Sequence, residues 1–280
     1  MMPYQKQELN EDLEDTDGVV ENMQRYFVRA DQILEDRVVL DGDDAHHLIR
    51  VMRARLDDKI IVSDGRDREV LAQISNIGKG TVEARIVERL AMDREPVVRV
   101  TIAQSLPKGD KFETVIQKGT ELGAHKFVPF VSQRTVVQYD ERKEAKRLER
   151  WRKIAKEAAE QAHRNRVPEV TEAVRWRDIV QQAADYDIAI MCYEKAGSGR
   201  GLRPLLHSFR REHMAVFGER EPMIMLIVGP EGGFTEQEVE HAEQAGIRIV
   251  GLGSRILRTE TAAMVGLACI MYEYNEMGES

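Results

Sequence analysis

The sequence predicts an α/β protein in which a small β-barrel precedes a larger domain with a mainly parallel sheet. Short β-like segments separated by turns fill the region before Pro96, and strand-like and helix-like segments alternate after it. Alternation of this kind is typical of a parallel sheet with helices on both faces. A chain of 280 residues is long enough for two such domains.

Residues 1–22 form an acidic tail with seven acidic residues against one lysine, a net charge of −6. The tail has few large apolar side chains, so burial cannot offset the entropy of ordering, and we expect it to be disordered. Folded-looking sequence begins abruptly at Met23. The tail is either a genuine extension or the product of an upstream start codon, and the sequence leaves both open.

Residues 23–95 are predicted to form the small barrel. Its strand candidates are separated by turns at Asp41-Gly42, Asp64-Gly65 and Gly78–Gly80. The candidates are Val38–Leu40, Lys59–Ser63, Glu69–Ile74 and Thr81–Val87. One helix is expected over Asp43–Arg53, with acidic residues in its first turn and with Leu48, Val51 and Met52 on an apolar face.

Residues 96–280 are predicted to form the second domain. Its strand candidates are Val97–Gln104, His125–Val131, Asp187–Tyr193, Met223–Val228 and Ile247–Gly251. Its helix candidates are Lys111–Leu122, Glu141–His163, Trp176–Ala184, Leu202–Arg210, Thr235–Ala245 and Glu260–Tyr274. Thr235 and Glu238 have the spacing of a capping box, and Gly123 and Gly246 lie where helices are expected to end.

The charge distribution permits a local basic face despite a net charge of −8. Residues 108–166 contain fifteen Lys and Arg against nine Asp and Glu, a net charge of +6. This segment either binds phosphate or is only a solvated helix face. Cys192 and Cys269 have no metal-site or disulfide spacing, and no apolar run is long enough to cross a bilayer. We therefore expect a cytoplasmic protein that binds neither a membrane nor a metal ion.

Two glycine-rich segments predict a binding pocket. Met223–Phe234 is an apolar run that ends at Gly229-Pro-Glu-Gly-Gly233, and Ile247–Gly253 is a second short strand that ends in glycines. Ligands of open α/β sheets bind at this carboxyl edge, where glycines expose backbone groups. The segments contain neither a dinucleotide nor a P-loop fingerprint, and Glu231 would repel a pyrophosphate. One such turn alone would be only a tight connection, but the pair favours a pocket for a small, cationic or hydroxyl-rich molecule.

Several basic residues are candidates for chemistry or for RNA contacts. Arg258 opens the last helix, where a cation opposes the helix dipole, so it either pairs with Glu260 or Glu231 or faces a phosphate or a base. Arg164 shares a helix face with Gln161. Further candidates for RNA phosphate contacts are Lys108, Lys111, Arg25, Arg50 and Arg53.

Together these motifs resemble the RsmE family, bacterial methyltransferases of uridine N3 in 16S ribosomal RNA. The resemblance spans residues 23–274 and is most specific in Gly229–Phe234 and Leu252–Ala262. Further matching segments are Gln24–Phe27, His46–Arg53, Leu106–Lys111, Gln117–Gly123 and Glu157–Gln161. Lys118-Gly119 replaces the more usual lysine-alanine, and the acidic tail lies outside the family pattern.

The resemblance implies a PUA-like barrel followed by a SPOUT domain with a trefoil knot, acting as a homodimer on 16S ribosomal RNA in the small subunit. It implies that S-adenosylmethionine (AdoMet) binds at Gly229, Glu231, Gly232, Leu252, Gly253, Ile256 and Leu257. Arg258 or Arg164 is expected to stabilise charge on the uracil, and Glu231 is a candidate base. The alternatives are another SPOUT specificity, an assembly factor without catalysis and, least favoured, a nucleotide-dependent oxidoreductase.

Overall fold

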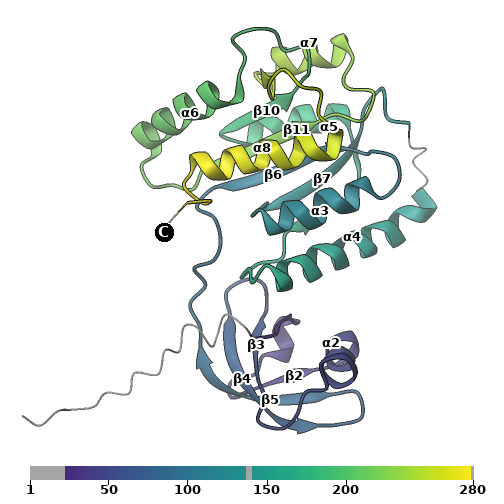
Figure 1. Ribbon diagram of the computed structural model, residues 1–280, viewed down its shortest axis with the longest axis vertical. Helices are drawn as coiled ribbons and strands as arrows, with labels where there is room; N and C mark the ends of the chain where they lie inside the picture. Colours follow the sequence, from purple (N-terminus) through teal and green to yellow (C-terminus); the bar gives the residue numbers. More distant parts are fainter. Residues whose placement is uncertain (1–22, 137–140, 279–280) are drawn as a thin grey trace, which may run out of the picture. The chain divides into compact units, whose positions relative to one another are not determined.

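The computed structural model describes residues 23–136 and 141–278, so the expected tail at residues 1–22 lies outside the described residues. The chain divides into two compact units (Figure 1). The first comprises residues 23–64 and 68–90, and the second comprises residues 91–278, with residues 65–67 grouped with it. The division falls a few residues before the boundary expected at residues 95 and 96.

The first unit is a five-stranded sheet in the order β1-β3-β4-β5-β2. β1 pairs in parallel with β3, the other pairs are antiparallel, and the end strands β1 and β2 are not paired with each other in the described sheet. The strands are β1 Arg25–Phe27, β2 Arg37–Leu40, β3 Lys59–Ser63, β4 Glu69–Ile77 and β5 Val82–Arg89. Sequence patterning predicted all of them except β1, whose three residues are all buried and show no alternation.

The helix expected over Asp43–Arg53 has an unusual second half. A short α2 at Gly42–His46 continues as a π-helix at His47–Met52, which ends at Arg53 with φ 53°. Leu48 is buried as predicted, but Val51 is 61% and Met52 40% exposed. The prediction of one apolar face was wrong for these two residues, because a π-turn is wider than an α-turn and changes which positions share a face.

The sheet of the second unit is parallel throughout, in the order β12-β10-β11-β6-β7-β8, with β9 also paired to β7. This confirms the predicted parallel sheet. Its strands are β6 Arg99–Ser105, β7 Lys126–Val131, β8 Glu169–Val170, β9 Val174–Arg175, β10 Ile188–Cys192, β11 Met223–Val228 and β12 Arg248–Val250. The two-residue strands β8 and β9 were missed, because a pair of residues carries no periodic signal.

Helices cover both faces of this sheet, and Figure 1 shows α3 and α8 in front of it. The helices are α3 Lys111–Glu121, α4 Glu141–Gln161, α5 Trp176–Gln182, α6 Leu202–Phe217, α7 Glu236–Gln244 and α8 Thr259–Glu273. Side chains of α3, α6 and α8 share one core, and those of α5 and α7 share the other. The α6 helix runs well beyond its predicted end at Arg210, to Gly218 with φ 63°. No described helix is long and apolar enough to span a bilayer.

Gly119, where the resembled family more usually has alanine, lies against a large aromatic side chain. A Cβ atom at residue 119 would lie 2.7 Å from Cε1 of Phe127 and 3.2 Å from Cδ1 of Ile102. Interiors are packed too closely to accept such contacts without movement. The departure from the family pattern therefore makes room for the Phe127 ring between α3 and the sheet.

Candidate functional site

The two glycine segments meet at the carboxyl edge of the parallel sheet and enclose a cavity of about 470 Å³. β11 and β12 flank β10, so the turns that follow all three strands lie at the same edge. The cavity is lined by residues of these turns and of the start of α8. They are Lys111, Cys192, Tyr193, Glu194, Val228, Gly229, Pro230, Glu231, Gly233, Phe234, Leu252, Gly253, Ser254, Arg255, Ile256, Leu257, Arg258, Thr259 and Ala262.

Six of the seven residues predicted to bind a cofactor line this cavity: Gly229, Glu231, Leu252, Gly253, Ile256 and Leu257. Gly232 does not; its carbonyl accepts a hydrogen bond of 2.9 Å from Arg134 Nη1, and Gly233 lines the cavity instead. The predicted site residues did not include Cys192, Tyr193 and Glu194 at the end of β10, or Thr259 and Ala262 in the first turn of α8. The carboxyl end of the predicted strand Asp187–Tyr193 was the available signal for the first group, since it reaches the same sheet edge.

Gly229 and Gly253 are required for different physical reasons. A Cβ atom at residue 229 would lie 2.9 Å from Cε2 of Phe234, whose ring stacks on Phe130 and packs against Trp176. Gly253 instead has φ 99°, with nothing within 4 Å of the Cβ position. The first turn therefore depends on a close approach, and the second depends on a backbone conformation that L side chains rarely adopt.

Glu231 forms an ion pair at the edge of the cavity. Its Oε1 accepts hydrogen bonds from Lys111 Nζ at 2.7 Å and from the backbone N–H of Lys108 at 3.1 Å. Burial acts to raise the pKa of Glu231, but the hydrogen bonds from Lys111 and from backbone N–H groups outweigh it and hold the pKa below its usual value. Glu231 is therefore ionised at neutral pH. The side chain of Lys111, which was predicted to contact RNA, instead binds this carboxylate, whereas Lys108 contributes only its backbone N–H and its exposed side chain stays a candidate for RNA contact.

Arg258 lies at the N-cap position of α8, is exposed and lines the cavity. Neither ion pair considered for it forms, because Glu231 binds Lys111, and Lys111 Nζ is also 3.9 Å from Glu260 Oε2. Among the described residues, none forms a hydrogen bond or an ion pair with the Arg258 side chain. Its guanidinium is thus available to a ligand at the mouth of the cavity.

Arg164 lies at the opposite edge of the sheet and is buried. Its guanidinium donates to Glu95 Oε2 at 2.6 Å and to the carbonyls of Thr120 and Ala124 at 3.1 and 2.7 Å. Ala124 precedes the amino end of β7, whereas the cavity lies at the carboxyl ends of the strands. The predicted catalytic and RNA-binding roles of Arg164 are corrected accordingly: its donors are used inside the fold.

The first unit contains three arginines that were predicted to contact RNA, and one of them is buried whereas the other two are exposed. Arg25 is 4% exposed and forms an ion pair with Glu69, so the prediction that it contacts RNA phosphate is also corrected. Arg50 and Arg53 are exposed, one on the π-helix and one directly after it. These two stay candidates for RNA contacts.

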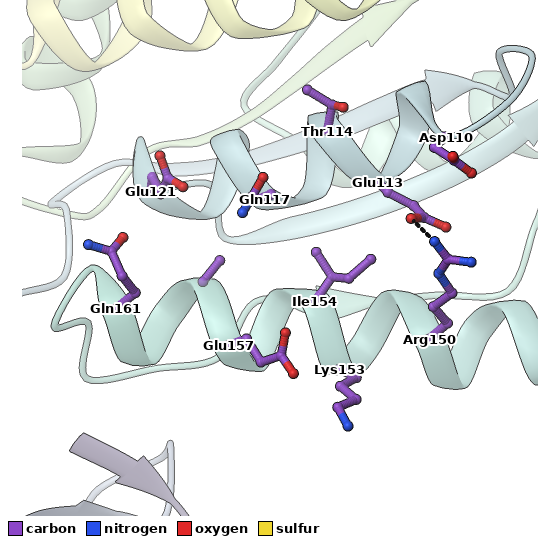
Figure 2. A pocket seen from close by; sticks show the side chains of 11 residues that line it. Asp110, Glu113, Thr114, Gln117, Glu121, Arg150, Lys153, Ile154, Glu157 and Gln161 are labelled. Atoms are coloured by element: carbon purple, nitrogen blue, oxygen red, sulfur yellow. Dashed lines mark hydrogen bonds and ion pairs between the residues drawn. The ribbon is translucent and has the colours of Figure 1, made fainter. Parts of the chain in front are cut away.

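A second hollow, the α3–α4 groove, measures about 550 Å³ and is lined by side chains of the two helices (Figure 2). Arg150 Nη2 and Glu113 Oε2 form an ion pair of 2.6 Å across it. Its lining residues are Asp110, Glu113, Thr114, Gln117, Glu121, Arg150, Lys153, Ile154, Glu157, Ala158 and Gln161. No glycine turn reaches this groove, and no group of three potential metal ligands occurs in the described part of the chain. The cavity at the sheet edge is therefore the candidate functional site.

Comparison with known families and proteins gives a consistent result. A family model described as an RNA methyltransferase domain matches residues 93–271, and one described as an RNA methyltransferase PUA domain matches residues 40–87. The chain is 40% identical over 258 residues to ribosomal RNA small subunit methyltransferase E of Bacillus subtilis, with 90% of this chain and 97% of that protein covered. The protein of the same name from Synechocystis sp. is 35% identical, with 88% and 76% covered.

Solved structures agree with these matches. Ribosomal RNA small subunit methyltransferase E of Neisseria gonorrhoeae, bound to S-adenosyl methionine, superposes with a TM-score of 0.75 at 31% identity, covering 89% of this chain and 97% of that chain. A methyltransferase of Legionella pneumophila in complex with the same cofactor gives a TM-score of 0.78 at 28% identity, with the same coverage.

Proposed function

This chain belongs to the RNA methyltransferase family that includes ribosomal RNA small subunit methyltransferase E, and we propose that it transfers a methyl group from AdoMet to N3 of a uridine in 16S ribosomal RNA. The observation that carries this proposal is the cavity formed by two glycine turns at the carboxyl edge of a parallel sheet. The cofactor is AdoMet, and the enzyme class is an AdoMet-dependent rRNA methyltransferase.

The cavity fits AdoMet in size and in chemistry. Its volume of about 470 Å³ lies in the range of ligand pockets. The glycine turns offer backbone N–H and C=O groups, and Ile256 presents an apolar side chain that is 85% exposed and that a flat base could cover. The ion pair of Glu231 with Lys111 holds the first turn at the edge of the cavity. When bound, AdoMet supplies an electrophilic methyl group on a positively charged sulfonium.

The protein's part in the reaction is to orient the base and to stabilise charge. Uracil N3 becomes nucleophilic once it loses its proton to water at the open mouth of the cavity, and negative charge then spreads to the carbonyl oxygens. Arg258, exposed at the mouth of the cavity without a partner among the described residues, is positioned to stabilise that charge. Glu231 already accepts two hydrogen bonds and has a lowered pKa, so we assign it to ligand binding rather than to proton transfer.

Cys192 lines the same cavity, where a nucleophilic thiolate would compete for the methyl group. Burial, with a smaller contribution from Cys269, raises the pKa of the Cys192 thiol to about 12. Because the thiolate is the reactive form of cysteine, the protonated thiol stays inert beside the cofactor.

Two further properties belong to this proposal. A homodimer is supported by apolar side chains exposed at the end of α8 and beyond it, where Tyr272 is 72% and Met277 48% exposed. A knot is implied by the family resemblance, and a 2.8 Å hydrogen bond from Gly251 N to the carbonyl of Arg200 joins the segment after β12 to the connection between β10 and α6. Sedimentation equilibrium tests the dimer, for which we expect twice the chain mass of 32.0 kDa.

Nucleoside mass spectrometry tests the proposed reaction. Small ribosomal subunits that lack the modification are incubated with the protein and AdoMet, digested and compared with a sample without enzyme. We expect a gain of 3-methyluridine. A different methylated nucleoside would overturn the specificity, and a lack of both methylation and AdoMet binding would favour an assembly factor without catalysis.

A further inference from the structure

A buried polar network lies beside the cavity and connects two of its lining residues, Gly229 and Thr259, to Gln104 behind them. Gln104, near the carboxyl end of β6, is fully buried. Its side-chain Nε2 donates to Thr259 Oγ1 at 2.8 Å and to the carbonyl of Ser105 at 2.9 Å. Thr259 Oγ1 in turn donates to the carbonyl of Gly229 at 2.5 Å. The network thus joins three segments that are far apart in the sequence.

The direction of these hydrogen bonds is fixed by the groups involved. Nε2 of Gln104 faces three acceptors, since the Gly229 carbonyl also lies 3.3 Å away. Rotating the amide by 180° would place its oxygen against two carbonyl oxygens, so only one orientation is compatible with the site. The Thr259 hydroxyl accepts from Gln104 and therefore has its proton free for Gly229. A threonine or serine can do both, and an apolar side chain can do neither.

Gln104 itself does not line the cavity, but both of its downstream partners do. Gly229 is the first residue of the turn after β11, and Thr259 is the first residue of α8. We propose that Gln104 is a positioning residue for AdoMet, which acts through Thr259 to hold the Gly229 turn and the start of α8 at the spacing that the cofactor needs. This inference rests on the proposed assignment of the cavity to AdoMet.

The unsatisfied half of the amide supports a role beyond packing. Gln104 Oε1 is buried and has no hydrogen-bond partner among the described residues. A buried acceptor without a partner destabilises a fold, so stability alone would favour an apolar side chain of the same shape at this position. The amide instead contributes its N–H group, which orients the Thr259 hydroxyl.

Isothermal titration with AdoMet tests the proposal on four single variants of the full chain. Thr259→Val keeps the shape of the side chain and removes the hydroxyl, and Gln104→Met removes the amide. Each should weaken AdoMet binding about tenfold, and their combination should add little, because both break one network. Thr259→Ser keeps the hydroxyl, so it should bind AdoMet almost as tightly as the wild-type protein and more tightly than Thr259→Val. The matched control is Thr120→Val, since Thr120 is a fully buried threonine of α3 that does not line the cavity.

Thermal unfolding of each ligand-free variant separates positioning from mere loss of stability. Thr120→Val and Thr259→Val change the same atoms, so a positioning role requires that only the second weakens AdoMet. If Gln104→Met does not fold, the Thr259→Val and Thr259→Ser pair decides alone. Wild-type affinity in folded Thr259→Val, or equal losses in the valine and serine variants, would overturn the inference. Absence of AdoMet binding in the wild-type protein would instead overturn the assignment of the cavity.

Discussion

The two edges of the parallel sheet each hold an arginine that the sequence marked for chemistry, and the fold uses the two in opposite ways. At the carboxyl edge, Arg258 is exposed beside the cavity and has no partner among the described residues. At the amino edge, Arg164 is 5% exposed and binds Glu95 and two carbonyl groups. The same type of side chain is thus available to a ligand at one edge and is held by hydrogen bonds inside the fold at the other.

The difference follows from what each edge offers. The amino edge supplies a carboxylate and backbone carbonyls that satisfy the guanidinium, and Glu95 also accepts the backbone N–H groups of Asn165 and Arg166, both at 3.1 Å. The carboxyl edge supplies glycine turns, and its carboxylate Glu231 is already bound by Lys111. The guanidinium of Arg164 is therefore paired with Glu95, whereas that of Arg258 stays available because Glu231 is paired with Lys111.

The largest expected effect is a loss of stability in Arg164→Met. Removing one partner of a buried ion pair leaves the other without compensation, and we expect the free energy of unfolding to fall by about 3–5 kcal/mol. Chemical denaturation measures this change. A variant that folds with wild-type stability and AdoMet affinity but no longer methylates RNA would contradict the comparison and return Arg164 to the active site.

The next effect is a loss of catalysis in Arg258→Ala. If Arg258 stabilises charge on the uracil, the methylation rate at saturating AdoMet should fall by about 10²–10³-fold, as when an oxyanion-hole donor is removed. AdoMet affinity should change by less than about twofold, and stability by no more than about 0.5 kcal/mol. Single-turnover methylation and isothermal titration provide the two measurements.

Arg211→Ala is the matched control for Arg258→Ala, because Arg211 is an exposed arginine of α6 that does not line the cavity. It should keep the wild-type methylation rate. Equal losses of rate and of AdoMet affinity in Arg258→Ala would show that the arginine binds the cofactor rather than the reacting base.

The contrast between the two edges also explains what the sequence could predict. An apolar run that ends in glycines is a local pattern, so the strands β11 and β12 and the glycine turns after them followed from it, whereas the individual cofactor residues were assigned from the family resemblance. The partner of Arg164 lies 69 residues away and that of Gln104 lies 155 residues away. No local pattern encodes such pairs. The burial of Arg164 and the polar network beside the cavity could therefore be recognised only from the structure. The short strands β1, β8 and β9 were missed because they are too short to show a period and no glycine turn follows them as one follows β12.

The smallest expected effect separates backbone strain from ligand contact at two glycines. Gly253 and Gly218 have φ of 99° and 63°, and nothing lies within 4 Å of the Cβ position of either. Replacing either by alanine therefore costs stability through the backbone alone, about 1–3 kcal/mol in each case. Only Gly253 lines the cavity. We expect Gly253→Ala to weaken AdoMet binding about tenfold, equivalent to about 1.4 kcal/mol.

Gly218→Ala should instead bind AdoMet as the wild-type protein does, because residue 218 ends α6 and lies outside the cavity lining. Thermal unfolding and isothermal titration on the same two samples give both quantities. If the two variants lost stability equally and AdoMet affinity equally, the affinity would follow global stability, and the glycine turn would have no specific role. A loss of affinity confined to Gly253→Ala would show that the carboxyl edge is sensitive to local geometry, as a site that binds its ligand through backbone groups must be.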